Sequence, residues 1–550
     1  MDAAGPAPAV VARGLDTLDQ RAARGNNDLV LGLQLVVALG VAILVAHALA
    51  RRVPVPVPAI LVLAGSALFW LPGFDHVGLP PEVVLLLFLP ALLYWEAITS
   101  SARHIRKFAR GIVLTGTLLV VVTAAVVAVV ANALGVPWGL AWIIGAALAP
   151  TDATAVAALR RLLPRRNLGT LQAESLINDG TALVVYGLAV AFAAEGRMPS
   201  AGEITGQFAL SFFGGIAVGL VVGWVAHRVR SRIPNHVDTN IASVLTPFVA
   251  YLLAEEVHAS GVLAVVTCGL YMARVTPRTV AAATRQQGAA FWTLSTTVLN
   301  AALFVLIGLQ LPASVQRVAP AELAHDLLIC AAVFATLPLV RWLFLTVSIG
   351  VIRALDRRPA QRALRTTWRG RVVSAVAGLR GGVSLAVALS VPDDLPGRHL
   401  VVFVTGTVVV ASLLIQGSAL PAVIRWAGLP RDTTDEDEYA RAQIAASEAA
   451  LESLDALAAG LDVDDAVADA ARSNLEQHLR ALAADRAGNE EAASVVRSRQ
   501  ARDLHLALLH RKRTTIIELR DQRVIDDVVL RRIQAQLDAE EVRLTPPETE

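Results

Sequence analysis

The sequence predicts an all-α polytopic membrane protein with a helical tail, and three observations support this fold class. The 550-residue chain is 55% hydrophobic and only 17% charged, with a mean hydropathy of +0.57. An ordinary globular chain carries about 25% charged residues. Apolar runs long enough to cross a bilayer recur along most of the chain, and most of the acidic residues lie at one end. We therefore expect about 13 transmembrane helices followed by a separate helical unit.

The transmembrane helices are predicted from the length of each apolar run. A bilayer core requires about 20 apolar residues per helix. Thirteen runs meet this need, at 29–50, 54–72, 80–100, 109–134, 138–163, 169–194, 205–227, 238–257, 259–275, 287–311, 322–352, 371–391 and 399–427. The pair at 238–275 could be one broken unit, so twelve spans is the alternative. The first run is long and follows 28 residues, so it does not resemble a cleaved signal peptide.

Lys and Arg in the loops predict the orientation. One set of alternate loops holds 23 of these residues, and the other holds three: Arg197, Arg317 and Arg398. Because cytoplasmic loops carry the excess of Lys and Arg, the basic set is expected to be cytoplasmic. Residues 1–28 then form a short extracytoplasmic segment, 29–430 a transmembrane domain, and 431–550 a cytoplasmic domain of a multi-pass protein of the cell membrane.

The tail differs from the membrane part in charge and periodicity. From Asp432 to Glu550 there are 26 acidic and 15 basic residues, whereas the 403 residues before it from Leu29 contain 16 acidic ones. Apolar residues recur at helical spacing, as at Leu451, Leu454 and Leu457, which predicts three or four amphipathic helices. An appendage for stability or dimer contact and a regulatory sensor are both open readings.

Two classes of protein are excluded. No basic stripe stands clear of a membrane loop, so a nucleic acid is not an expected partner. The two cysteines, Cys268 and Cys330, lie in apolar runs, which excludes a disulfide scaffold.

Ionisable residues inside membrane spans are costly, so each one is a candidate for function. Four acids and one arginine lie well within the predicted spans: Glu96, Asp152, Glu174, Asp179 and Arg380. Arg341 is nearer to the end of its span, and we expect it to extend toward the interface.

The first of three polar segments contains a proline within a span. Pro150 removes a backbone hydrogen bond and clashes with the preceding turn, and Thr151 and Asp152 follow it directly. An interrupted helix at membrane depth is tolerated only where it is buried in protein or lines a water-filled cavity.

The second segment is Glu174–Thr181. On a helix, Ser175, Asn178 and Asp179 lie at i, i+3 and i+4 and share one face, and Glu174 lies one turn from Asn178. Oxygen ligands suit a hard cation such as Na⁺. A carboxylate in a low-dielectric site also takes up a proton more readily than it does in water. One Asp that holds either a proton or a metal ion is enough for an exchanger.

The third segment is Gly378–Leu385, where three glycines around Arg380 suit an unwound stretch. It lies in the twelfth predicted span, and the proline break lies in the fifth. The odd offset makes the two interrupted helices run in opposite directions, as inverted six-helix repeats would require. Such a pair is a strong indication of a transport site.

These segments resemble the sodium/proton antiporters of the bacterial NhaP and eukaryotic NHE branch. The shared motifs are Ala-Pro-Thr-Asp-Ala-Thr, Glu-Ser-Leu-Ile-Asn-Asp-Gly-Thr and Gly-Leu-Arg-Gly-Gly-Val-Ser-Leu-Ala, and the segment ending in Glu96 is similar to the third span of that family. The resemblance covers roughly residues 29–430. It implies a homodimer in the lipid membrane, with a dimerisation domain, a mobile core domain and two crossed, discontinuous helices.

The resemblance also implies roles for single residues. Asp179 would exchange Na⁺ for H⁺, with Thr151, Ser175 and Glu96 completing the ion shell and Asp152 beside it. Asn178 replaces the first Asp of the electrogenic relatives, which implies electroneutral exchange. Glu174 and Arg380 would form a structural ion pair. The chain departs from the family pattern at Trp95, before Glu96, where relatives more often have a smaller residue.

The leading hypothesis is therefore a secondary transporter, not an enzyme, that exchanges Na⁺ for H⁺ without a cofactor. Exchange of Li⁺ or K⁺ by the same fold stays open, since selectivity depends on ligand geometry. Two mid-membrane aspartates would also permit an intramembrane aspartyl protease, but no Gly-x-Gly-Asp segment occurs. A channel is disfavoured by the expected buried ion pair.

Overall fold

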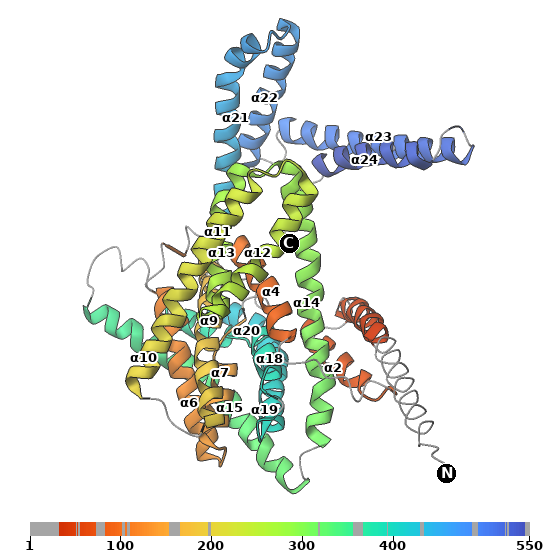
Figure 1. Cartoon of the computed structure of the whole chain (residues 1–550). Coiled ribbons are helices and arrows are strands. Elements are labelled where there is room, and N and C mark those ends of the chain that lie inside the picture. Colours follow the sequence, from red (N-terminus) through yellow and green to blue (C-terminus); the bar gives the residue numbers. More distant parts are fainter. Residues whose placement is uncertain are drawn as a thin grey trace, which may run out of the picture. The chain divides into compact units, whose positions relative to one another are not determined.

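The computed structural model describes residues 32–50, 52, 56–72, 83–101, 105–106, 111–152, 165–195, 200–316, 320–355, 367–392, 394–428, 434–486, 493–522, 524 and 527–544. Every regular element in these ranges is a helix (Figure 1). Internal contacts divide the chain into two compact units, Met1–Arg431 and Asp432–Glu550. The predicted N-terminal segment, 1–28, lies outside the described residues.

Long apolar helices dominate the first unit. Within the described ranges, eight helices are long and apolar enough to cross a membrane: Gly32–Ala50, Gly111–Ala133, Gly169–Ala194, Thr205–Arg230, His236–Glu256, Ala282–Gln316, Pro320–Val351 and Arg398–Ala427. Four shorter apolar helices are Val57–Leu68, Leu86–Thr99, Trp138–Leu148 and Gly261–Pro277. These lengths and compositions identify a multi-pass membrane protein. The run at 238–275 folds as two helices that pack against each other, not as one broken unit.

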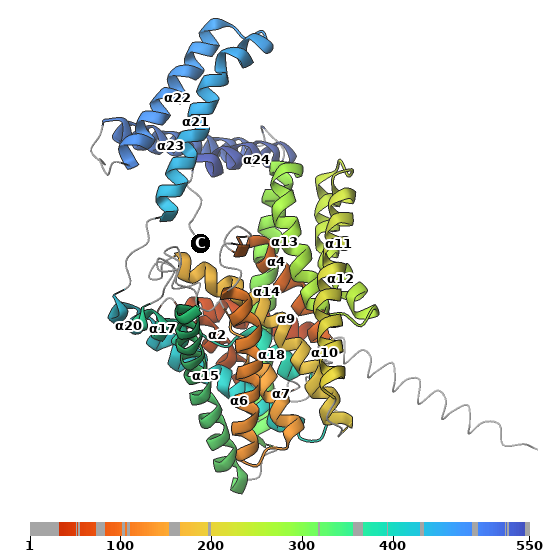
Figure 2. The same cartoon turned by 90° about the vertical axis from the view of Figure 1, so that its left-hand side faces the viewer.

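The helices of this unit have the following bounds: α2 Val57–Leu68, η1 Val84–Phe88, α4 Leu89–Thr99, η2 Leu114–Leu119, α6 Val120–Ala133, α7 Trp138–Leu148, α9 Arg165–Glu195, α10 Ala201–Ala209, η3 Leu210–Gly214, α11 Gly215–Arg230, α12 His236–Glu256, α13 Gly261–Thr279, α14 Ala282–Gln316, α15 Pro320–Leu355, α17 Trp368–Val376, α18 Gly382–Leu389, α19 Arg398–Ala411, η4 Ser412–Gln416 and α20 Gly417–Ala427. The elements marked η are π-helical turns within longer spans. Many of the helices run roughly parallel to one another (Figure 2).

Local side-chain caps explain where several helices begin. The Ser260 hydroxyl accepts a hydrogen bond from the Leu263 amide at 3.3 Å, at the start of α13. At the start of α17, the Thr367 hydroxyl accepts one from the Gly370 amide at 3.1 Å. Such caps satisfy backbone donors that have no partner inside the helix.

Small residues bring α2 and α14 into close contact. A Cβ atom at Gly65 would lie 2.0 Å from the Val305 carbonyl oxygen, and one at Gly308 would lie 2.1 Å from that of Val62. The Ser66 hydroxyl also donates a hydrogen bond to the Gly308 carbonyl at 2.9 Å. Membrane helices associate through such close packing, because lipid supplies no hydrophobic drive between them. The contact fixes the position of α14 against α2.

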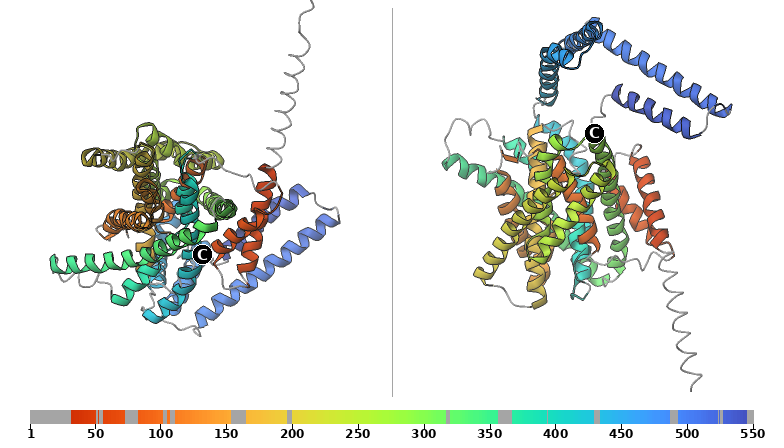
Figure 3. Two further views of the ribbon diagram at one scale, coloured as in Figure 1. Left: turned by 90° about the horizontal axis from the view of Figure 1, so that it is seen from below. Right: turned by 45° about the horizontal axis from the view of Figure 1, so that its top comes forward.

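The functional region lies between two sets of helices that pack among themselves. In one set, α4 packs against α12, α13 and α14. In the other, α7 packs against α9, α18 and α19, and α15 packs against α6, α17 and α19. The sets meet where α14 contacts α18 and α19 and where α4 contacts α9. Figure 3 shows several of these helices end-on in its left view.

The second unit consists of four helices, α21 Thr434–Gly460, α22 Asp465–Arg486, α23 Ala493–Asp521 and α24 Asp527–Leu544. α21 pairs with α22, and α23 pairs with α24. Arg513 on α23 binds Asp538 at 2.5 Å and Glu541 at 2.6 Å, both on α24. Among the described residues of this unit, only a few apolar side chains are buried, including Leu509, Leu530 and Leu537.

Candidate functional site: a cavity beside two helix breaks

The middle of α9 carries a set of buried polar side chains. Glu174, Ser175, Asn178 and Asp179 are between 1% and 3% exposed, although the helix around them is apolar. Burying charged and polar groups at such depth is costly unless other groups compensate them. Their partners therefore define the site.

The first helix break lies opposite Asn178. α7 ends at Leu148, and Pro150, Thr151 and Asp152 continue the chain without helical structure. The Asn178 side-chain amide donates a hydrogen bond to the Thr151 hydroxyl at 2.8 Å. This bond fixes the break against α9. The rest of the predicted interrupted span, 153–164, is outside the described residues.

The second break lies between α17 and α18, at 377–381, as the glycines around Arg380 predict. The Asp152 backbone amide donates a hydrogen bond to the Leu379 carbonyl at 2.8 Å, so the two breaks satisfy each other's backbone. The Arg380 backbone amide donates one to the Ser412 hydroxyl of η4 at 3.2 Å. A Cβ atom at Gly381 would lie 1.6 Å from Asp152 Oδ2, so this approach requires glycine. The backbone at both breaks is buried in protein, as the membrane demands.

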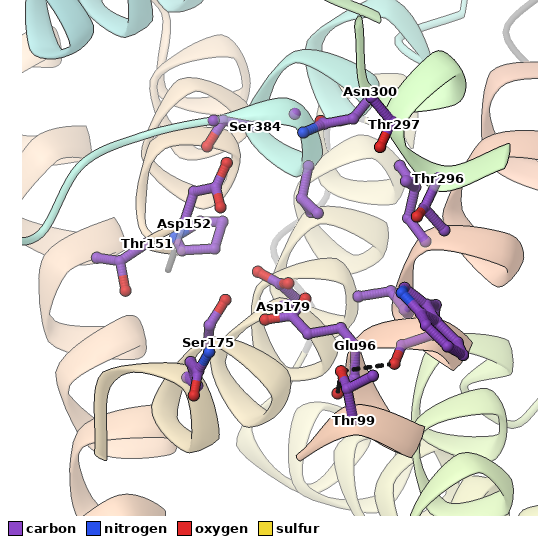
Figure 4. A pocket seen from close by; sticks show the side chains of 18 residues that line it. Glu96, Thr99, Thr151, Asp152, Ser175, Asp179, Thr296, Thr297, Asn300 and Ser384 are labelled. Atoms are coloured by element: carbon purple, nitrogen blue, oxygen red, sulfur yellow. Dashed lines mark hydrogen bonds between the residues drawn. The ribbon is translucent and has the colours of Figure 1, made fainter. Parts of the chain in front are cut away.

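A cavity of about 300 Å³ lies beside the two breaks (Figure 4). Three carboxyl groups line it, from Glu96 on α4, Asp152 at the first break and Asp179 on α9. Thr151 and Ser175 line it as well. Five of the six predicted ion- and proton-binding residues thus share one cavity, and the sixth, Asn178, lies behind Thr151 and holds it.

Two of the cavity carboxyl groups, those of Asp179 and Glu96, have no fixed cation among the described residues. Asp179 makes no hydrogen bond or ion pair with any residue that the structure describes. One carboxyl oxygen of Glu96, Oε1, is also buried without a hydrogen-bond partner. Carboxyl groups in this environment can be neutralised by a bound proton or by a mobile cation.

The predicted ion pair between Glu174 and Arg380 is wrong. Glu174 instead forms a salt bridge with Arg341 of α15, and both side chains are buried. The expectation that Arg341 extends toward the interface is also wrong, because its side chain is buried on α15 and bound to Glu174. Arg380 donates from Nη1 to the Gly378 carbonyl at 2.7 Å. Carbonyl groups in the unwound stretch have no helical hydrogen-bond partner, and Arg380 donates to one of them, that of Gly378.

Several cavity residues were not found from the sequence. Thr296, Thr297 and Asn300 of α14 line the cavity, as do Gln172 of α9 and Ser384 of α18. The signal for the first three was available, because their spacing puts them on one face of a helix. Neutral polar residues attract less notice than charges, since hydroxyls and amides are common in membrane helices.

The comparison with known families now decides the identity. Residues 38–426 match the family described as "Sodium/hydrogen exchanger, transmembrane". The chain belongs to this family. The resemblance inferred from the three motifs is confirmed. Members of the sodium/hydrogen exchanger family are transporters rather than enzymes, which excludes the intramembrane protease considered above.

Similar sequences and a solved structure of similar fold support this family assignment. An uncharacterised Na⁺/H⁺ exchanger of Mycobacterium tuberculosis is 39% identical, over 95% of this chain and 98% of its own. A sodium, potassium, lithium and rubidium/H⁺ antiporter of Bacillus pumilus is 30% identical, over 68% of this chain and 58% of its own. The sodium proton antiporter MjNhaP1 of Methanocaldococcus jannaschii has a similar fold. Its TM-score is 0.54 at 18% identity, over 72% of this chain and 98% of that one.

Proposed function

We propose that this exchanger moves Na⁺ across the cell membrane in return for H⁺, and that both ions compete for Asp179. The observation that carries the proposal is the position of Asp179. It is 2% exposed, lines a cavity beside the two helix breaks and has no partner among the described residues. A buried carboxylate without a fixed counter-ion has room for one mobile cation.

Neighbouring oxygens complete the proposed ion site. Thr151 and Ser175 supply hydroxyl oxygens to a Na⁺ ion at Asp179, which suits the preference of hard cations for oxygen. Asp152 and Glu96 supply further carboxyl groups at the cavity wall. Asn178 acts on the ion indirectly, because its amide holds Thr151 in place. The backbone hydrogen bond from Asp152 to Leu379 links the two breaks, so the site moves as one unit during alternating access.

The stoichiometry follows from which groups can carry protons. Asn178 occupies the position of a second acid and is neutral, and Glu174 is already paired with Arg341. Asp179 then carries either one proton or one Na⁺, and exchange is electroneutral.

The assembly and orientation are part of the same proposal. The transporter is a homodimer in the lipid membrane, with the unit Asp432–Glu550 in the cytoplasm, because the basic loops predict that side. Selectivity between Na⁺, Li⁺ and K⁺ depends on ligand geometry. The name of the Bacillus pumilus antiporter includes potassium, which keeps K⁺/H⁺ exchange as the second candidate for this chain.

A flux assay tests the function. Purified protein in proteoliposomes with an imposed pH gradient should dissipate the gradient when Na⁺ is added, and parallel additions of Li⁺ and K⁺ rank the cations. Asp179→Asn keeps the side-chain size but can neither take up a proton nor offer a charge, so it should abolish exchange while the protein stays monodisperse. Substantial exchange by that variant would show that another group carries the ions.

A further inference from the structure

We infer that Asn300 on α14 is a further cation-binding residue, which contributes a neutral amide oxygen to the ion from the wall of the cavity opposite α9. The inference rests on the proposed exchange function and extends its ion site to a helix that none of the motifs includes. It starts from the polar face that α14 presents to the cavity.

The two threonine hydroxyl groups on this face can act only as acceptors or cation ligands toward the cavity. Thr296 donates its hydroxyl proton to the Trp292 carbonyl at 2.7 Å, and Thr297 donates to the Thr293 carbonyl at 2.7 Å. Since each hydroxyl has one proton, both oxygens present only lone pairs to the cavity. Lone pairs are what a partly dehydrated cation requires.

Asn300 lies one helical turn beyond Thr296, and its amide has no hydrogen-bond partner among the described residues. Figure 4 shows its side chain directed into the cavity beside Ser384. A Cβ atom at Gly382 would lie 2.8 Å from Asn300 Oδ1, so the glycine at the start of α18 makes room for this oxygen. Amide oxygens can replace the hydration shell of a monovalent cation, as the carbonyl oxygens of channel filters do.

The position of α14 makes this contribution specific. α14 is fixed against α2 through the Gly65–Gly308 contact, whereas Asp179 lies on α9 in the other set of helices. An ion held between Asp179 and Asn300 therefore bridges the two walls of the cavity. The amide can coordinate a cation but does not take up a proton, so it should affect Na⁺ affinity and leave the proton competition unchanged.

The experiment measures Na⁺-dependent exchange in proteoliposomes over a range of pH for wild type, Asn300→Ala and Asn300→Ser. For Asn300→Ala we expect the apparent KM for Na⁺ to rise about three- to tenfold at every pH, the size of effect that loss of one ordinary polar contact has. The maximal rate should stay within about twofold, and the proton inhibition constant should not change. Asn300→Ser keeps an oxygen, so its apparent KM for Na⁺ should lie between those of wild type and Asn300→Ala.

Asn240→Ala is the matched control. Asn240 on α12 also packs its amide oxygen against a glycine of α14, Gly288, at 3.1 Å from the Cβ position, but it does not line the cavity. Its substitution should leave KM unchanged. An unchanged KM in both Asn300 variants, or a lower maximal rate at constant KM, would overturn the inference while leaving Na⁺/H⁺ exchange intact. If Asn300→Ala does not purify as a monodisperse protein, Asn300→Ser decides. Absence of any exchange by wild type would instead contradict the proposed function.

Discussion

Two carboxyl groups on α9, Glu174 and Asp179, are equally buried and have opposite surroundings. Glu174 is bound by Arg341 of α15, with Arg380 nearby as a second positive charge. Asp179, little more than one turn away, faces a cavity and has no cation among the described residues. One apolar helix thus carries a carboxyl group with a fixed partner and another that has none among the described residues. The partner on the neighbouring helix decides which role each carboxyl group has.

The fixed pair should therefore act on stability, and the free carboxyl group on transport. Removing one member of a buried ion pair leaves an uncompensated charge in a low-dielectric environment. Removing a carboxyl group that has no fixed partner leaves no such charge. The following predictions separate the two sites.

The largest expected effect is on the fixed pair. Arg341→Ala and Glu174→Ala should each lower the free energy of unfolding by about 3–5 kcal/mol, because each leaves the other charge buried and unpaired. The double variant should lose less than the sum. The measurement is thermal unfolding of the purified protein in detergent, arranged as a double-mutant cycle.

The cycle of Glu174→Ala with Arg380→Ala is its control. Arg380 bonds to the Gly378 carbonyl rather than to Glu174, so its coupling to Glu174 should be the smaller of the two. Additive losses for Arg341 with Glu174, or a stronger coupling for Arg380, would restore the pairing that the sequence suggested.

A smaller effect is expected where the two breaks touch. Gly381→Ala would place a methyl group against the Asp152 carboxylate, so one break must shift away from the other. We expect a loss of about 1–3 kcal/mol, typical of overpacking, together with slower exchange. Unfolding and flux measurements on the same preparation check both.

Gly187→Ala is the matched control for Gly381→Ala. Gly187 lies on α9, as Asp179 does, and a Cβ atom there would meet nothing within 4 Å. It should leave stability and flux close to wild type. Equal behaviour of the two alanine variants would mean that the close approach at Asp152 has no energetic importance.

Much of the site could be predicted from the sequence, and the reasons are physical. Pro150 directly before Thr151 and Asp152, and the three glycines around Arg380, predict the two breaks, because each places helix-breaking residues beside a charge within an apolar span. The spacing of Ser175, Asn178 and Asp179 announces their common face. Charged residues and helix-breaking residues can therefore be recognised from the sequence alone.

The partner of Glu174 could not be predicted in this way. Arg341 lies on another helix, 167 residues further along the chain, and its pairing depends on how α15 packs beside α9. The family motifs suggested Arg380 as the partner of Glu174, but Arg380 donates a hydrogen bond to the Gly378 carbonyl of its own loop. Asn300 was missed for a related reason, since its importance comes from the helix it faces. Contacts between distant helices need the three-dimensional structure.

Competition at Asp179 should appear as a pH-dependent affinity for Na⁺. A proton on the carboxyl group excludes the cation, so lowering the pH should raise the apparent KM. The rise approaches tenfold per pH unit, or about 1.4 kcal/mol, once the protonated form dominates. Initial rates at several Na⁺ concentrations between pH 6 and 9 measure this. A KM that stays constant over the whole range would contradict direct competition.

The smallest expected effect is that of membrane potential, which should be zero. With Asn178 neutral and Glu174 paired, one proton and one Na⁺ exchange at a single carboxyl group, and no net charge crosses the membrane. The test compares the endpoint of exchange in proteoliposomes at clamped potentials of about 0 and −100 mV. If a second proton moved in each cycle, the endpoint would shift by about 2.3 kcal/mol, or about fiftyfold in ion ratio. Such a shift would show that a second cavity carboxyl group also carries a proton. Glu96 and Asp152 are the only other carboxyl groups that line the described part of the cavity, so Glu96→Gln and Asp152→Asn would then identify the carrier.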